Sequence, residues 1–145
     1  MVAACASGGP SADVAMCQAA RSLSMAAGLV AQAAVKDAAG DNVGAQGLAG
    51  DAAMLAKQAD DVLQGIISSD ARQGDTWQAL TLAYLRVGQA ANALLPAYAN
   101  TYGITDEELA RGWQQLQAVR PRLPADCFPP ISPAGSPLPS ASGSG

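Results

Sequence analysis

Apolar residues recur at alternating spacings of four and three in four separate stretches of this chain. This spacing aligns the apolar side chains along one face of an α-helix. In residues 11–40 and 46–68, the positions predicted to face inward are Met16, Ala20, Leu23, Ala27, Val30 and Ala34, and then Leu48, Ala52, Leu55, Ala59, Val62 and Ile66. In residues 75–98 and 105–120, they are Leu80, Tyr84, Val87, Ala91, Leu94 and Tyr98, and then Leu109, Trp113 and Leu116. No stretch has the strict alternation of a strand, so the pattern predicts an all-α, up-down-up-down antiparallel four-helix bundle.

Capping and breaking residues predict where these helices begin and end. Ser11 and Asp75 are the expected N-caps of the first and third helices, because a short polar side chain there accepts a bond from a free backbone N–H. Gly40 is expected to end the first helix, and the polar residues 68–74 separate the second from the third. Pro121 is expected to end the fourth helix at Arg120.

The segment "ITDEEL" predicts the start of the fourth helix most clearly. Thr105 is its expected N-cap, and Glu108 is the expected reciprocal partner in a capping box. Ile104 and Leu109 are placed to form a hydrophobic staple.

Composition shifts divide the chain into three parts. Residues 1–10 form a flexible tether, residues 11–128 the bundle, and residues 129–145, "PPISPAGSPLPSASGSG", a low-complexity tail predicted to be disordered. The net charge is −4 and histidine is absent, so the chain lacks the basic footprint of a nucleic-acid-binding protein. The most apolar window, residues 79–99, contains Arg86, whose charge favours a helix buried in the bundle over a membrane span.

Catalytic constellations are not recognisable in the sequence. Without histidine there is no Ser-His or Cys-His pair and no Glu-x-x-His motif of the di-iron bundles. The two glutamates, Glu107 and Glu108, are explained as first-turn helix residues. We therefore expect a non-catalytic protein with no cofactor and no metal. A haem or lipid carrier is the alternative, and its candidate residues are Tyr84, Tyr98, Met16 and Met54.

Two of the three cysteines are predicted to form a disulfide. In an up-down-up-down bundle, the start of the first helix and the end of the fourth lie at the same end, which brings Cys17 and Cys127 within reach of each other. In the chain-entropy model, closing a loop of about 110 residues stabilises the fold by roughly 4–5 kcal/mol. Two buried free thiols are the alternative.

Cys5 closes the sequence "VAAC" at residues 2–5 and is followed by "ASGGPS". These residues resemble the lipobox and flexible tether of bacterial lipoproteins. The resemblance implies that Cys5 carries a diacylglyceryl group and begins the mature protein, with a signal peptide that starts upstream of Met1. It also implies a lipid-anchored or secreted protein at the extracytoplasmic face of the bacterial cell membrane. A cytoplasmic helical adaptor with three reduced thiols is the alternative.

Val14, Met25, Leu29 and Leu82 are apolar residues off the predicted inward faces, so they form a possible partner surface. Residues 123–128 or the tail cover the positions on the first helix, or a partner protein does, or a bend in the helix shifts these positions toward the core. The loops 36–47 and 100–104 are expected to point away from the membrane and to meet a partner. Three roles fit the sequence equally well: interference with phage adsorption, service as an envelope scaffold, and service as an accessory subunit of a larger system.

Overall fold

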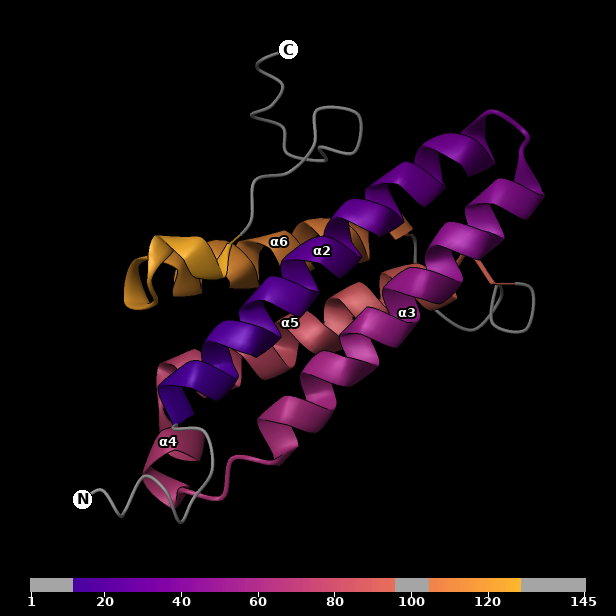
Figure 1. Cartoon of the computed structure of the whole chain (residues 1–145). Helices are drawn as coiled ribbons and strands as arrows, with labels where there is room; N and C mark the ends of the chain where they lie inside the picture. The colour runs from indigo at the N-terminus through magenta and orange to yellow at the C-terminus, as the bar shows by residue number, and fades with distance from the viewer. Residues whose placement is uncertain (1–11, 96–104, 129–145) are drawn as a thin grey trace.

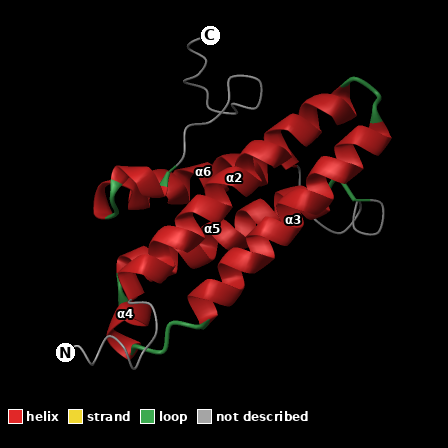
Figure 2. Cartoon of the chain, in the orientation of Figure 1, coloured by secondary structure: helices red, strands yellow, loops and turns green. Residues whose placement is uncertain are grey.

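A computed structural model of the chain describes residues 12–95 and 105–128 (Figure 1). It contains only helices, turns and loops in those ranges (Figure 2). The elements are α2 (Ala12–Ala38), α3 (Asn42–Gln64), α4 (Ser69–Gln73), α5 (Asp75–Asn92) and α6 (Thr105–Val119), then the 3₁₀ turns η1 (Arg120–Arg122) and η2 (Ala125–Cys127). The four long helices pack antiparallel to their neighbours in chain order, which confirms the predicted fold class.

Helix α2 is the centre of the bundle, because it packs against α3, α5, α6 and η2. Its buried positions include five of the six predicted inward residues, while the sixth, Ala34, is partly buried. Further small residues widen this face on both sides, namely Ala15, Ala19, Ser24, Ala26, Gly28 and Ala33. The buried surface therefore covers much of the helix circumference, as contact with several neighbours requires.

Among the described helices, α2 is also the one long and apolar enough to cross a membrane by length and composition. Its most apolar 18-residue window has a mean hydropathy of 1.3, and 56% of that window is buried inside the bundle. A helix at the core of a bundle has the same properties. The window 79–99, predicted to be the most apolar, extends beyond the described residues.

Helix α3 differs from the prediction in its ends and in its buried face. It begins at Asn42 instead of residue 46, since the Asp41 carboxylate accepts a bond from the Gly44 N–H at 2.9 Å and caps it. It ends at Gln64, before residue 68. Its fully buried residues are Ala45, Ala49, Ala52, Ala56, Ala59 and Leu63, whereas the predicted Leu48, Leu55 and Val62 are only partly buried. Small side chains let the helices approach closely, so the larger ones lie at the edges of the contact.

The link between α3 and α5 is a short helix, where the prediction was a simple break. The Ser68 hydroxyl accepts a bond from the Ala71 N–H at 3.2 Å and caps α4. Gly74 ends α4 and is also the N-cap of α5, so the predicted cap by Asp75 is wrong and Asp75 is instead the first helical residue. Because Gly74 is the capping residue of both helices and has no side chain, α5 begins without a side-chain cap.

Helix α6 buries Leu109, Trp113 and Leu116 as predicted, and it ends before Pro121. Glu108 does not lie on the surface as a simple capping residue. Its carboxylate accepts a bond from Arg86 of α5 at 3.1 Å and is nearly buried. The remaining capping, staple and inward-face predictions are not tested, because they rest on residues outside the described ranges, namely Ser11, Tyr98, Ile104 and the Thr105 side chain. The tether and the tail also lie outside the described residues.

Candidate functional site

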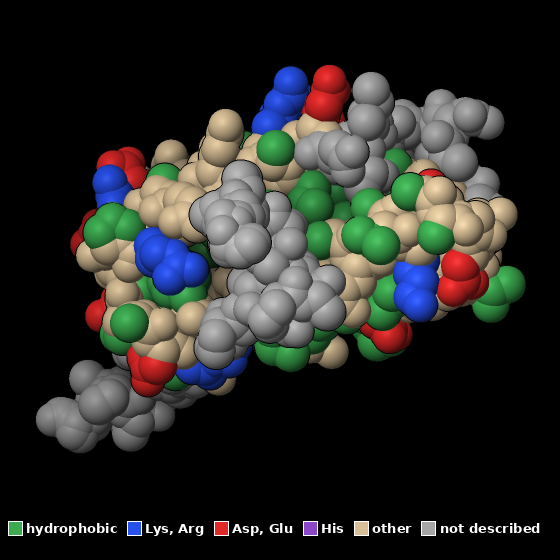
Figure 3. Space-filling view, turned by 90° about the horizontal axis from the view of Figure 1, so that it is seen from above, with side chains coloured by type: hydrophobic (Ala, Val, Ile, Leu, Met, Phe, Trp, Pro, Cys, Tyr) green, Lys and Arg blue, Asp and Glu red, His purple; other side chains and the backbone are tan. Residues whose placement is uncertain are grey.

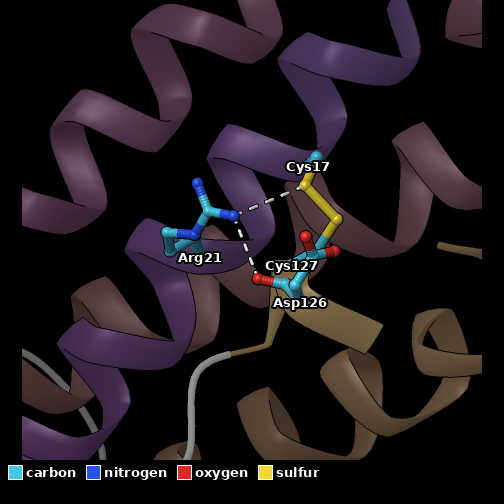
Figure 4. The surroundings of a disulfide bond; sticks show 4 residues. All are labelled: Cys17, Arg21, Asp126 and Cys127. Carbon is cyan, nitrogen blue, oxygen red and sulfur yellow. Dashed lines mark hydrogen bonds between the residues drawn. A yellow bond between two sulfur atoms is a disulfide. The ribbon is translucent and has the colours of Figure 1, made fainter. Parts of the chain in front are cut away.

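A disulfide joins Cys17 of α2 to Cys127 of η2, with their Cα atoms 5.0 Å apart (Figure 4). Cys17 lies in the second turn of α2. Cys127 is the last residue of η2, the second of the two 3₁₀ turns that follow α6. The antiparallel arrangement brings these two ends together, which confirms the pairing predicted from the sequence. The bond links residues 110 positions apart and encloses the whole bundle in a covalent loop.

Arg21 holds the same junction from the next turn of α2. Its Nη2 donates to the Asp126 carbonyl oxygen at 2.9 Å and lies 4.0 Å from the Cys17 sulfur (Figure 4). Sequence reasoning missed this contact. Its only signal was the i, i+4 spacing of Cys17 and Arg21, which places both on one side of the helix.

The segment after α6 packs against α2 through the disulfide and the buried Phe128. Cys127 and Phe128 are buried, and Leu123 packs at the edge of the core. This packing does not cover Met25, which is 48% exposed. Leu29 is partly buried and packs against the core.

The other two residues of the predicted partner surface lie apart from Met25. Val14 is 49% exposed in the first turn of α2, three helical turns before Met25. Leu82 is exposed on α5, beyond the face that buries Leu80 and Ala83 in the bundle. Val14, Met25 and Leu82 are thus exposed, whereas Leu29 is partly buried.

A surface groove of about 300 Å³ lies between the first turns of α2 and the end of α3. Its lining residues are Ala12, Ala15, Gln18, Asp61, Val62, Gly65, Ile66, Ile67 and Ser68. Ile66 is buried, whereas Ile67 is 89% exposed. The sequence signal for an exposed isoleucine here was the pair of adjacent isoleucines after a helix, because two consecutive side chains rarely face the same core.

The opposite end of α2 and α3 carries a second set of exposed apolar side chains. Gly40 turns the chain there with a positive φ of 87°, as its predicted helix-ending role requires. Val35 and Val43 are largely exposed on either side of this turn, and Lys36 pairs with Asp41 at 3.8 Å. This turn belongs to the loop predicted to meet a partner, while the accompanying loop 100–104 lies outside the described residues.

Several charges in the described residues occur as pairs of opposite sign, and Figure 3 shows positive and negative side chains side by side on one face. On α3, a hydrogen bond from Lys57 to Asp61 raises the pKa of the Lys57 ammonium above its usual 10.5. Within residues 12–95 and 105–128, no group of three His, Cys, Asp or Glu residues is arranged to hold a metal ion.

The residues proposed for a ligand slot do not converge. Met16 of α2 is buried in the core, whereas Met54 is 59% exposed on the outer side of α3. The prediction that Met54 lines an interior slot is therefore wrong, because the alanine face of α3 turns inward in its place. Tyr84 is partly buried, and Tyr98 lies outside the described residues.

Comparisons with protein-family models, with curated proteins and with solved structures find no match for this chain.

Proposed function

We propose that this protein is an exported, lipid-anchored helical module that binds a partner protein at the cell envelope and carries out no catalysis. The observation that carries the proposal is the disulfide between Cys17 and Cys127. Disulfides persist in oxidising compartments outside the cytoplasm and are rare in cytosolic proteins.

The pairing leaves Cys5 as the one cysteine without a cysteine partner in the chain. Its position at the end of "VAAC" supports lipidation, which would use the third thiol. One acyl attachment and one disulfide together account for all three cysteines. An odd cysteine in an exported protein otherwise needs a separate explanation.

The helix geometry is compatible with a partner site far from the anchor. Cys5 lies seven residues before Ala12, the first described residue of α2. Helix α2 has 27 residues and is therefore about 40 Å long. The turn around Gly40, with the exposed Val35 and Val43, is at the opposite end of α2 from the proposed anchor, so a flexible tether allows this turn to lie well away from the membrane.

Intact-mass analysis of the protein isolated from its natural host tests this proposal. We expect a polypeptide that begins at Cys5, carries the added mass of a diacylglyceryl group, and lacks two hydrogens because of the disulfide. A Cys5→Ser variant controls for modification elsewhere and is expected to lose the lipid and the membrane association while keeping the disulfide. An unmodified chain with three free thiols would contradict the proposal and support the cytoplasmic adaptor.

A further inference from the structure

Residues 120–128, here called the C-terminal latch, have little internal structure of their own. They form two 3₁₀ turns whose hydrogen bonds are local, from the Cys127 N–H to Pro124 O at 3.0 Å and from the Phe128 N–H to Ala125 O at 3.1 Å. Most of the latch is exposed, and only Cys127 and Phe128 are buried. A segment with few buried contacts opens more easily than the helices beside it.

A small set of contacts attaches this latch to the bundle. The Asp126 carbonyl receives the bond from Arg21, and Arg122 pairs with Asp75 of α5 at 3.3 Å. The Phe128 side chain is buried, but the cation that stacks on its ring at 5.0 Å, Arg120, belongs to the latch itself. Apart from its peptide bond to the end of α6, the latch is covalently attached to the bundle by the disulfide.

We propose that the Cys17–Cys127 disulfide is a redox-controlled attachment of the C-terminal latch, and that its reduction releases residues 120–128 while the helices stay folded. The helices have an independent basis for stability, because the main core cluster is built from α2, α3, α5 and α6. The latch contributes two buried side chains to that core. This inference rests on the disulfide alone, so it stands or falls separately from lipidation at Cys5.

The reaction is thiol–disulfide exchange with a dithiol. One thiolate of the dithiol attacks a sulfur of the bond and forms a mixed disulfide, while the other cysteine sulfur leaves as a thiolate. The second thiol of the reductant then closes its own disulfide and releases the first cysteine. One dithiol thus supplies two electrons, and the two cysteine sulfurs gain two protons.

Amide hydrogen exchange followed by mass spectrometry tests the latch directly. The oxidised protein and the same protein in excess dithiothreitol are compared, with peptides that cover α2, α6 and residues 120–128. We expect exchange in the latch peptide to rise at least tenfold on reduction and to approach that of an unstructured peptide, while peptides from the middle of α2 and α5 stay at least tenfold better protected than the latch. Reoxidation is expected to restore the protection.

A Cys17→Ser variant gives the same comparison without reductant, and trypsin then probes the bond after Arg122. We expect at least tenfold faster cleavage there than in the oxidised wild type, with cleavage after Arg111, inside α6, unchanged. An Arg122→Gln control removes the site. Equal protection with and without the disulfide would show that packing alone holds the segment. Equal acceleration at Arg111, or loss of helical circular dichroism, would show that the bond supports the whole bundle. Either result would overturn the proposal.

Discussion

The α2–α3 side and the α5–α6 side of the bundle are held together by different kinds of side chain. Helix α3 turns five alanines and one leucine toward the core. Helix α6 instead buries large residues, Leu109, Trp113 and Leu116, and its Gly112 lies against Val87 of α5. An ion pair between Arg86 and the nearly buried Glu108 crosses the same α5–α6 contact.

This difference shows two ways to build a helix contact with few aromatic residues. Alanine buries little apolar area per residue, but it has the highest helix propensity and lets helices approach closely. Many small contributions therefore stabilise the α2–α3 contact, and the contact requires small side chains on the facing surfaces of the two helices. The α5–α6 contact depends on a few large side chains, so removal of one of them should matter more.

Trp113→Ala is expected to have the largest effect. It removes the largest buried side chain of α6 and should lower the free energy of unfolding by about 3–5 kcal/mol, because a cavity remains. Ala52→Gly on α3 should cost only about 1 kcal/mol, mainly through helix propensity. Urea denaturation of both variants checks the order. Equal losses would show that the two contacts have the same basis.

Ala52→Leu reverses the comparison. Ala52 has no exposed surface, so added bulk must displace neighbouring side chains and should cost about 1–3 kcal/mol. The same change at Ala118, which is exposed on α6, should stay within about 0.5 kcal/mol of the wild type. Thermal unfolding followed by circular dichroism measures both. A neutral Ala52→Leu would mean that α2 and α3 do not depend on close approach.

Two glycine substitutions should differ in their effect on stability. A Cβ at Gly112 would lie 2.8 Å from Cγ2 of Val87, a buried branched side chain with little freedom to move, whereas a Cβ at Gly50 would meet nothing within 4 Å. Gly50→Ala should therefore stabilise the protein by about 1 kcal/mol through helix propensity. Gly112→Ala should fall short of that gain or destabilise.

The double variant Gly112→Ala with Val87→Ala identifies the cause in a double-mutant cycle. If the contact with Val87 is responsible, Gly112→Ala becomes more favourable in the Val87→Ala background than in the wild type. A Gly112→Ala effect that is the same in both backgrounds would contradict the steric explanation.

The sequence predicted the side of the bundle where large residues alternate with polar ones, and it was less accurate where alanine is abundant. Leu109, Trp113 and Leu116 are buried as the spacing indicated. On α3, the pattern favoured Leu48 and Leu55 over the alanines beside them, because larger residues dominate a hydrophobic pattern. Helix contacts in three dimensions then selected the smaller residues.

For the candidate site, topology was enough to predict Cys17 with Cys127, since chain order fixes which helix ends are neighbours. The contacts of Arg21 with Asp126 and of Arg86 with Glu108 could not be predicted in the same way. Both join residues whose distance depends on how the helices are rotated. The hydrophobic pattern did not resolve how a helix is rotated, as the buried face of α3 also shows.

The smallest expected effect concerns the exposed ion pair of α3, which contrasts with the nearly buried pair between α5 and α6. The hydrogen bond to Asp61 raises the pKa of Lys57 above its usual 10.5, so the pair favours the folded state fully below the usual pKa. This contribution is lost as the pH rises through the higher, folded-state pKa. Between pH 7 and pH 10, the pair should therefore make stability neither rise nor fall.

NMR titration of the Lys57 side chain measures this shift directly. Asp61→Asn should return the titration midpoint toward the usual value, since it removes the negative charge and replaces the carboxylate acceptor with a weaker, neutral amide oxygen. Asp60→Asn is the matched control and should change the midpoint less, because Asp60 acts on Lys57 only through its charge. Solvent screens such pairs strongly, so neither variant should measurably change the urea midpoint at pH 7. A clear loss of stability in Asp61→Asn would place α3's outer face among the contributors to the fold and weaken the contrast with the α5–α6 pair.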